Sequence, residues 1–515
     1  MKGTGIRGWT SITADQWRRL RQMVQTLSFL LFLYLLLGTQ QQTATVLPHD
    51  LFFRLDPLAG LGAMIAGRQW IPALALGLVT ALLTLLFGRV WCGWLCPMGT
   101  TLDWTRLRRD LPDERDLHFR WRQAKYLILF VVVFAALMGN LTLLVLDPVT
   151  LLFRTITVAL LPALDVVVTA AEKALYNVEV LRGPVEGFDG LVRDAVLPVG
   201  PHFYEQSLLI GLVFLGIVAL NAVRPRFWCR YLCPLGALLG LISKVGWLRH
   251  RVDKNDCIEC GRCVRVCPTG TVDPERGFTA DPSECTLCLD CESACPSNAV
   301  GFRGLLGLAN WQRYDPSRRQ AIASLGVTVL GVGLLRSVPS VLLPHNWLIR
   351  PPGAREDDIL SKCIRCGECI RVCPTGGLQP GLGVAGWEGL WTPVLVPRLG
   401  YCDYSCNACG QVCPTGVIPR LDLEQKRQTV IGLAYIDRDR CIPWADGRDC
   451  IVCEEMCPVP DKAIFLEERT LTYALGGATT VRCPHVIRER CIGCGICEAK
   501  CPIKGKAAIR VYLPS

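Results

Sequence analysis

Long apolar runs fill the first half of the chain, separated by polar stretches. Four of them approach or reach the roughly 17–25 residues that a membrane-spanning helix needs, at Met23–Thr39, Ile71–Phe87, Tyr126–Leu146 and Ser207–Val223. Each run is apolar on all faces, whereas an amphipathic helix of a soluble protein keeps one polar face. The pattern therefore predicts an all-α transmembrane bundle of four helices. Four buried core helices of a soluble protein are the alternative.

Two further apolar segments are less regular. Ala159–Ala171 is interrupted by Pro162 and Asp165, so we expect an interfacial or re-entrant piece rather than another span. Ala321–Leu335 follows Arg318-Arg319, and paired arginines before a moderately apolar run resemble a twin-arginine export signal. We expect this second segment to form a fifth, uncleaved crossing.

Lys and Arg gather on one side of the four runs. The N-terminal tail and the loop that contains Arg89 are rich in both, whereas the first outer loop holds only Arg54 and Arg68. Because Lys and Arg accumulate on the cytoplasmic side, both ends of the bundle are expected there. Nucleic-acid binding is the competing explanation of the net charge of +10. We expect no nucleic-acid partner, because the arginines lie at the membrane ends without a recognition motif.

The bundle contains an internal repeat. Arg89–Gly99 reads RVWCGWLCPMG and Arg226–Gly236 reads RFWCRYLCPLG, each after the second helix of a pair. Upstream, Asp56 and Asp147 occupy matching Leu-Asp-Pro sequences. By analogy with other repeat-built membrane proteins, duplicated helix pairs predict a pseudo-twofold bundle with functional groups near its axis.

Each repeat carries two cysteines four residues apart, which would share one face of a helix. They are Cys92 with Cys96, and Cys229 with Cys233. Four thiolates from two symmetric sites could hold one metal cluster or act as a dithiol pair, so these cysteines are candidate redox or metal residues. The alternative is that small, soft side chains simply pack where helices end.

After Arg251 the chain becomes polar and its cysteines acquire a strict spacing. Of the 29 cysteines, six sets of four each end in Cys-Pro. Four sets read C-x-x-C-x-x-C-x-x-x-C, the set that begins at Cys402 has one extra residue in its first gap, and in the set that begins at Cys441 this gap is eight residues long. Bacterial ferredoxins with two 4Fe–4S clusters show this spacing, with three close cysteines on one cluster and the fourth on the other.

This exchange of the fourth cysteine between two paired sets predicts six 4Fe–4S clusters with 24 cysteine ligands. The sets are Cys257, Cys260, Cys263 with Cys295; Cys285, Cys288, Cys291 with Cys267; Cys363, Cys366, Cys369 with Cys413; Cys402, Cys406, Cys409 with Cys373; Cys441, Cys450, Cys453 with Cys501; and Cys491, Cys494, Cys497 with Cys457. Zinc is the alternative, but zinc sites usually draw two ligands from each of two separated pairs. Cys483 is left as a spare thiol.

The motifs together predict a multi-domain membrane protein of the bacterial inner membrane. The transmembrane domain covers residues 1–250, and a cytoplasmic ferredoxin module (the first module) covers 251–305. Residues 306–345 contain the fifth crossing. Two periplasmic modules follow, at 346–425 (the second module) and 426–515 (the third module). Each of the three modules is expected to be an α+β two-cluster (8Fe–8S) ferredoxin-like unit.

The order of these motifs resembles a pair of bacterial proteins joined end to end. Residues 1–305 are similar to the NapH/MauN type, with four helices, two C-x-x-x-C-P motifs and a cytoplasmic two-cluster ferredoxin. Residues 310–515 are similar to the NapG/MauM type, with a twin-arginine leader and four 4Fe–4S sites. The resemblance implies a quinol dehydrogenase accessory pair that passes electrons from membrane quinol to periplasmic reductases, such as the nitrate reductase system. Fusion departs from the separate-subunit pattern and leaves the acceptor open.

Quinol oxidation needs a proton acceptor at membrane depth. Asp56 and Asp147 are our candidate bases, with His202, Tyr204 and Glu205 as weaker ones. The alternative is that Leu-Asp-Pro is only a cap and turn. Electrons would leave through the clusters to a periplasmic cytochrome c or molybdenum reductase. Across about 30 Å of hydrocarbon, either a cofactor at the C-x-x-x-C-P cysteines or quinone itself would connect the two groups of clusters.

Two other functions fit the same motifs. The chain could be a maturation or regulatory factor, since relatives with these helices and cysteines support copper-oxidase assembly or nitrous-oxide reductase maintenance. It could also carry electrons in reverse, from a cytoplasmic donor to quinone. Six cluster motifs in one chain favour a conduit, because an assembly role has no evident need for so many relays.

Overall fold

The computed structural model describes residues 13–41, 47–106, 119–197, 202–304, 347–473 and 477–514, with a few residues between 322 and 333. The chain divides into two compact units. Unit 1 comprises residues 1–36, 46–153 and 211–333, and unit 2 comprises residues 37–45, 154–210 and 334–515. Most of the expected fifth crossing at Ala321–Leu335, with Arg318-Arg319, lies outside the described residues.

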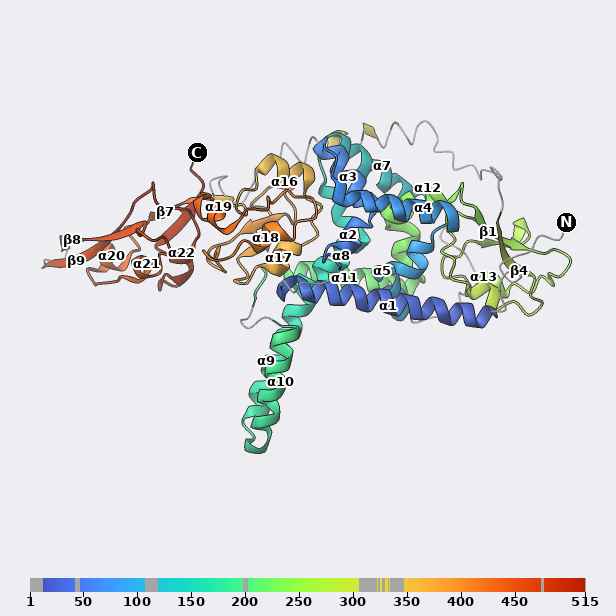
Figure 1. Ribbon diagram of the computed structural model, residues 1–515, viewed down its shortest axis with the longest axis horizontal. Coiled ribbons are helices and arrows are strands. Elements are labelled where there is room, and N and C mark those ends of the chain that lie inside the picture. Colours follow the sequence, from blue (N-terminus) through green and yellow to red (C-terminus); the bar gives the residue numbers. More distant parts are fainter. Residues whose placement is uncertain are drawn as a thin grey trace. The chain divides into compact units, whose positions relative to one another are not determined.

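Helices dominate the chain up to residue 243 (Figure 1). The main ones are α1 (Ala14–Gln41), α3 (Pro57–Gly67), α4 (Gly77–Phe87), α5 (Pro97–Trp104), α7 (Ala124–Leu137), α8 (Pro148–Thr155), α9 (Leu161–Tyr176), α10 (Arg182–Ala195), α11 (Ser207–Val223) and α12 (Pro234–Ser243). Two continuous helices, Ala14–Gln40 and Pro148–Tyr176, are long and apolar enough to cross a membrane. Helices α3, α7, α11 and α12, and the segment Pro72–Phe87, are apolar but shorter.

Three of the predicted helix boundaries differ from the observed ones. The run Ile71–Phe87 begins with a 3-10 turn before α4. The run Tyr126–Leu146 is α-helical only to Leu137, because Gly139 turns the chain with a φ of +76°. The interfacial or re-entrant piece expected at Ala159–Ala171 lies instead within one continuous helix, Pro148–Tyr176. A π-helical turn, η5 (Ile156–Leu160), leads into Pro162, and the helix continues to Tyr176.

In unit 1, buried apolar side chains join the helices. Helix α7 packs against α3 and α12, and α12 also packs against α4. Phe153 contacts Phe53 and Phe32 edge-on, at ring-centroid distances of 5.2 and 6.2 Å. Fully burying one such ring contributes about 1.5–3 kcal/mol. These contacts hold together the helix ends beside the two Leu-Asp-Pro sequences.

The first module belongs to unit 1 and has two small antiparallel sheets. Strand β1 (Leu248–Val252) pairs with β4 (Val300–Gly304), and β2 (Val272–Asp273) pairs with β3 (Thr279–Ala280). Short helices α13 (Arg262–Val266) and α14 (Asp290–Ser293) follow the cysteine loops. Strands and short helices thus alternate as an α+β module requires.

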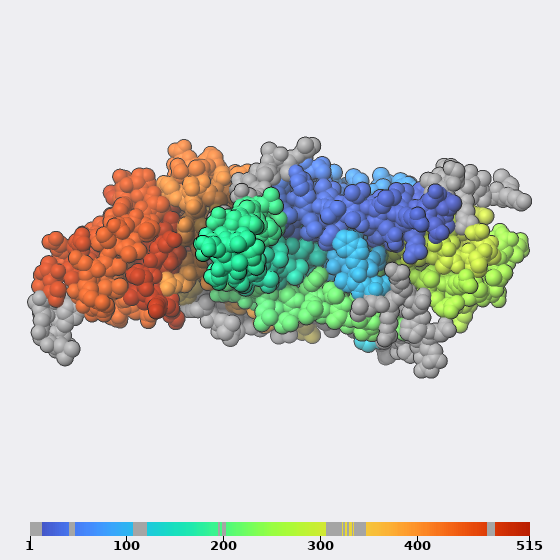
Figure 2. Space-filling view, turned by 90° about the horizontal axis from the view of Figure 1, so that it is seen from below, coloured from blue at the N-terminus to red at the C-terminus, as the bar shows by residue number. Residues whose placement is uncertain are grey.

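Unit 2 contains the second and third modules, which form one continuous surface in orange and red in Figure 2. The second has α17 (Glu368–Val372), α18 (Ala408–Gln411), and paired β5 (Leu378–Pro380) and β6 (Pro393–Leu395). The third has α20 (Ile442–Asp446), α21 (Val452–Glu455), α22 (Ile496–Lys500), paired β7 (Leu433–Ile436) and β10 (Ile509–Tyr512), and the hairpin of β8 (Ile464–Tyr473) and β9 (Gly477–Val486). Helices α9 and α10 form a helical hairpin in the same unit (Figure 1).

Candidate redox centres

In the second module, eight cysteines line two cavities of about 390 and 410 Å³. Cavity A is lined by Cys363, Cys366, Cys369 and Cys413, and cavity B is lined by Cys373, Cys402, Cys406 and Cys409. In each case the fourth cysteine comes from the other half of the module. The structure therefore brings together the same crossed sets that the spacing predicts.

The third module has the same arrangement, with cavities of about 340 and 360 Å³. Cavity C is lined by Cys457, Cys491, Cys494 and Cys497, and cavity D is lined by Cys441, Cys450, Cys453 and Cys501. The long gap between Cys441 and Cys450 contains helix α20, so the insertion leaves both cysteines at the same cavity. Cys483 is fully buried in β9 and is not among the residues that line cavity D.

In the first module, cavity E of about 300 Å³ is lined by Cys267, Cys285, Cys288 and Cys291. These four are again a predicted crossed set. For the remaining set, Cys263 interacts electrostatically with Cys260 and Cys257, and Cys260 is exposed. The described geometry thus groups three members of that set and leaves Cys295 as a predicted fourth member.

The donor sets fit a polynuclear iron–sulfur centre. Among the described residues, no three His, Cys, Asp or Glu side chains converge closely enough for a single metal ion, whereas a cube of iron and sulfide fills a wider space. Backbone N–H groups of Arg365, Ala434 and Ala463 donate to the sulfur atoms of Cys363, Cys491 and Cys457 at 3.3–3.4 Å. Such bonds are common around cluster thiolates.

Burial works against free thiolates in these cavities. It raises the pKa of Cys285, Cys453 and Cys494 to about 12, because the negative form loses its hydration. Metal ligation requires deprotonated thiols, and a bound cation supplies the charge that holds them in that form. The cavities are therefore suited to a resident metal centre rather than to open thiol chemistry.

The four cavities of unit 2 form a row in the order A, B, C, D. Cys369 of cavity A interacts electrostatically with Cys409 of cavity B. The backbone N–H of Cys402, at cavity B, donates to the carbonyl of Cys494, at cavity C, over 2.9 Å. Cys497 of cavity C in turn interacts with Cys453 of cavity D. Each cavity thus contacts the next one in the row, and the Cys402–Cys494 hydrogen bond connects the second module to the third.

Helical segments of unit 2 cover the end of the row at cavity A. Arg154 is 1% exposed, stacks over the ring of Trp391 at 4.4 Å and donates to the carbonyl of Arg365 at 2.9 Å. Trp391 and Arg365 both line cavity A. Arg371 donates to the carbonyl of Val196 at 3.2 Å. The second module therefore packs directly on the segment between residues 154 and 210.

The weaker base candidates lie in this same contact. His202 Nε2 donates to the carbonyl of Pro374 at 3.1 Å, and Tyr204 is buried beside Cys373 of cavity B. Burial lowers the pKa of His202 and raises that of Tyr204. Glu205 is exposed and uses its backbone N–H to bind Gln379. The three residues hold a loop against the second module.

The two C-x-x-x-C-P motifs adopt matching conformations in unit 1. Cys92 and Cys229 lie in the π-helical turns η3 (Trp91–Leu95) and η7 (Trp228–Leu232). Cys96 and Cys233 follow in extended backbone, as the residues that precede α5 and α12. The expectation that each pair shares one face of an α-helix is therefore wrong, since π-turns re-aim the side chains, as they often do at functional sites.

The four cysteines of these motifs nevertheless meet; we call them the thiol tetrad. All are buried, and their sulfur atoms are close enough to interact electrostatically with one another. The N–H of Gly236 donates to Cys233 Sγ at 3.2 Å. Arg89 Nη2 lies 3.9 Å from Cys92 Sγ. The N-terminus of α12 and a guanidinium thus face the sulfur atoms and offset part of the penalty that burial places on negative charge at this site.

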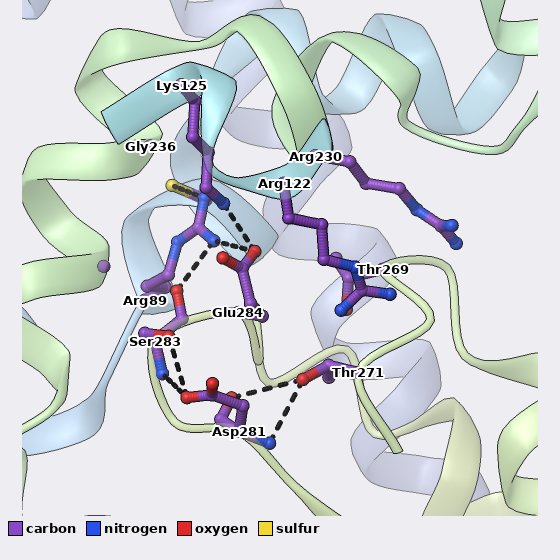
Figure 3. A network of polar contacts seen from close by, with 12 residues as sticks. Arg89, Arg122, Lys125, Arg230, Gly236, Thr269, Thr271, Asp281, Ser283 and Glu284 are labelled. Carbon is purple, nitrogen blue, oxygen red and sulfur yellow. Dashed lines mark hydrogen bonds and ion pairs between the residues drawn. The ribbon is translucent and has the colours of Figure 1, made fainter. Parts of the chain in front are cut away.

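Arg89 also joins a buried polar network that links the tetrad to cavity E. Figure 3 shows Arg89 and Lys125 pointing at Glu284, the residue before Cys285. Glu284 Oε2 accepts from Lys125 Nζ at 2.5 Å and from Arg89 Nη1 at 3.3 Å, and its Oε1 accepts from Tyr126 at 3.1 Å. Arg89 Nη1 also donates to the carbonyl of Ser283 at 3.0 Å. Arg89 is only 1% exposed, so it is a buried ion-pair partner of Glu284 rather than a solvated loop charge.

The π-turns themselves rest on the cysteine loops of the first module. Trp94 Nε1 donates to the carbonyl of Leu287 at 3.0 Å, and Arg230 Nε donates to that of Pro268 at 2.9 Å. At Gly93 a Cβ atom would lie 1.9 Å from the carbonyl oxygen of Thr286, so only glycine fits. The tetrad and cavity E are therefore immediate neighbours.

The two repeated aspartates also meet. Asp56 Oδ1 accepts the N–H groups of Leu58 and Ala59 at 2.8 and 3.1 Å, and Asp147 Oδ2 accepts those of Val149 and Thr150 at 3.1 and 2.9 Å. Both residues are helix caps, as the alternative interpretation of Leu-Asp-Pro expects. Both are fully buried, and their carboxyl groups lie close enough to interact with each other.

Sequence reasoning missed Glu284, Lys125 and His250 as parts of these sites. A signal for Arg89 was present, because Arg89 and Arg226 stand three residues before the first cysteine of each repeat. Arg226 donates to the carbonyl of Cys92 at 3.2 Å and to Asp103 at 2.6 Å. Nothing in the sequence pairs Lys125 with Glu284.

Comparison with protein families identifies iron–sulfur domains along the chain. A family described as a 4Fe-4S binding domain matches residues 69–112 and 206–255, which contain both C-x-x-x-C-P motifs. A 4Fe-4S dicluster domain matches residues 256–299. Another 4Fe-4S binding domain matches residues 358–379 and 484–504.

Several curated proteins are similar to part of the chain. The methylamine utilization ferredoxin-type protein MauM of Methylorubrum extorquens is 38% identical over 207 residues, which cover 38% of this chain and 89% of that protein. MauM of Paracoccus denitrificans is 35% identical over 39% of this chain and 88% of that protein. The ferredoxin-type protein NapG of Escherichia coli is 35% identical over 32% of this chain and 69% of that protein. No solved structure matches the chain.

Proposed function

The chain belongs to the family of ferredoxin-type proteins that includes MauM and NapG, and from this premise we propose that it is a membrane-bound conduit that oxidises quinol and relays electrons to a periplasmic reductase system. Its iron–sulfur electron-transfer character follows from the family and from the 4Fe-4S domains. The observation that carries the proposal is the row of cavities A to D. One-electron transfer needs closely spaced redox centres, and the row provides sites for four of them.

In this proposal the six crossed cysteine sets are the iron ligands of six 4Fe–4S clusters. Bound clusters supply one-electron redox chemistry. The chain's own residues fix their positions, exclude water with apolar lining and donate backbone N–H groups to the thiolates. The Cys402–Cys494 hydrogen bond supports electron transfer between the modules, because it joins two cluster sites directly.

Asp56 and Asp147 are the proposed quinol bases. Two carboxylates in contact at a fully buried site cannot both be ionised, so the pair holds one proton between them and keeps one negative charge. Oxidation of one quinol to quinone releases two protons and two electrons. The charge accepts the first proton, and it accepts the second after the pair has passed the first on to solvent, while the backbone N–H groups of α3 and α8 keep the two side chains in position. The two electrons leave one at a time, each to a one-electron acceptor, which the proposed clusters would supply.

The thiol tetrad is proposed as a further redox or metal centre. Its contact with cavity E through Arg89, Trp94 and Arg230 supports transfer between the two. The match of both motifs to a 4Fe-4S binding domain points in the same direction.

The proposed location is the bacterial inner membrane, with several crossings. The two long apolar helices support membrane association. The Lys and Arg distribution supports a cytoplasmic N-terminus and first module, with the second and third modules in the periplasm. The proposed partners are the membrane quinone pool and a periplasmic cytochrome c or molybdenum reductase.

The test combines metal analysis with turnover. Anaerobically purified chain should contain about four iron atoms and four acid-labile sulfides per cluster site, and should oxidise a soluble quinol when a periplasmic acceptor is supplied. Zinc in place of iron would contradict the ligand assignment. A full iron content without steady-state quinol oxidation would contradict the conduit and favour a maturation factor. Cluster potentials too low for reduction by quinol would indicate electron flow toward quinone.

A further inference from the structure

His250 occupies an unusual position at the wall of cavity E. It lies on β1 opposite Phe302 of β4, is 5% exposed, and lines the cavity together with Cys267, Cys285, Cys288 and Cys291. The Phe302 ring meets the imidazole edge-on at a centroid distance of 5.5 Å. Cavities A to D have no histidine among their lining residues. His250 therefore distinguishes this cavity from the four of unit 2.

One hydrogen bond fixes the tautomer of this ring. The backbone N–H of Ala280 donates to His250 Nδ1 at 3.2 Å, so Nδ1 carries a lone pair and no proton. An imidazolium would carry a proton on both ring nitrogens and could not accept this bond, so the ring is neutral. A neutral imidazole with a bare Nδ1 carries its proton on Nε2.

The Nε2–H group has no acceptor among the described residues, although it is buried. A buried donor without a partner costs about 1–3 kcal/mol. The hydroxyl of Thr286, which lines the same cavity, is buried without a partner in the same way. Two orphan donors at one cavity wall indicate that the occupant of the cavity accepts hydrogen bonds. Sulfide and thiolate sulfur atoms are such acceptors.

Resting on the proposed function, we propose that His250 donates its Nε2–H to a sulfur atom of the cluster held by Cys267, Cys285, Cys288 and Cys291, and raises the reduction potential of that cluster. The reduced cluster carries one more negative charge than the oxidised one, so a donor stabilises the reduced form more. The step transfers one electron and makes or breaks no covalent bond. His250 acts directly on the cofactor as a hydrogen-bond donor, and the imidazole keeps its proton throughout.

Two amide substitutions separate the two ring nitrogens. His250→Asn keeps an acceptor near the position of Nδ1 for the Ala280 N–H group but lacks a donor that reaches the cavity. His250→Gln places an amide N–H near the position of Nε2. In redox titrations of the full-length chain followed by electron paramagnetic resonance, His250→Asn should shift the potential of one cluster to a more negative value, and His250→Gln should restore it at least in part. Cys285→Ser identifies the signal, because it should remove the same cluster.

A second measurement needs no substitution. Full-length chain labelled with ¹⁵N-histidine should show a weak nitrogen coupling to the reduced cluster of cavity E, and His250→Gln should abolish it. His485→Gln is the matched control, because His485 lies against Trp444 and Phe465 and lines none of the five cavities. An unchanged potential in His250→Asn, or no coupling in the labelled chain, would overturn the inference. Absence of all cluster signals from the unsubstituted chain would instead overturn the proposed function.

Discussion

Asp56 and Asp147 cap helices at equivalent positions of the two repeats, and their carboxyl groups meet at a fully buried point of unit 1. The remaining oxygens, Asp56 Oδ2 and Asp147 Oδ1, are buried and have no hydrogen-bond partner among the described residues. Capping alone needs one oxygen from each residue. A cap does not explain why the two carboxyl groups lie close together, whereas a proton shared between them does.

Substitution of either aspartate by asparagine separates the two functions. Asn is as good a helix cap as Asp, so Asp56→Asn and Asp147→Asn should fold and retain their iron. Each variant loses the ionisable group, and quinol oxidation should fall by about 10²-fold or more, as expected when a general base is removed. Reduction of the clusters by dithionite should be unaffected. Unchanged quinol turnover in both variants would leave Leu-Asp-Pro as a cap and turn only.

The crossed ligand sets predict which cysteine substitutions resemble one another. Cys413→Ser should remove the same cluster signal as Cys363→Ser, although Cys413 belongs to the other half of the second module. Cys373→Ser should match Cys402→Ser instead. Each loses about four iron atoms, and Cys483→Ser, the control, should lose none. If Cys413→Ser and Cys402→Ser removed the same signal, the crossing would be wrong.

Glu284 is expected to stabilise unit 1 in a pH-dependent way. Burial disfavours its carboxylate, but Lys125 and Arg89 outweigh burial and lower the pKa below its ordinary value. The stabilisation is therefore present above the ordinary pKa of about 4.3 and is lost as the pH falls through the lower folded value. Thermal unfolding measured from pH 7 to pH 3 should show this loss.

Glu284→Gln should remove that pH dependence and destabilise the chain at pH 7. It leaves two buried cations without a carboxylate, which costs about 3–5 kcal/mol. Glu275→Gln changes an exposed glutamate of the same module and should have little effect. Equal melting temperatures for the two variants would show that the network contributes no net stability.

Arg398 is expected to hold the second module against the third. Its guanidinium donates to the carbonyls of Glu498 and Cys501 at 3.1 Å and of Ile503 at 2.5 Å. Arg398→Ala removes hydrogen bonds to a charged group, worth about 1.5–3 kcal/mol each. Magnetic interaction between the reduced clusters of cavities B and C should weaken. Arg440→Ala, which loses one exposed bond to Lys506, should leave that interaction unchanged.

Much of the candidate site could be predicted from the sequence, because cysteine spacing reflects the geometry of what the cysteines surround. The spacing grouped the members of cavities A to E, including Cys441 across its long gap. Contacts such as Asp56–Asp147 could be anticipated only through the repeat. Buried ion pairs such as Lys125–Glu284 could not be predicted. A Lys or Arg beside an apolar run gives the same sequence pattern whether its side chain faces the cytoplasm or a buried carboxylate. Helix ends were misplaced where a 3-10 turn precedes α4 and where Gly139 turns the chain after α7.

The close approach of Gly93 to Thr286 has a consequence for biosynthesis. The turn that carries Gly93 can make its contact with Thr286 only after the loop around Thr286 has been translated, long after the first helices have left the ribosome. The early helices should therefore lack this contact until the first module has been synthesised. Folding of the first module thus also completes the packing of a turn in the amino-terminal half.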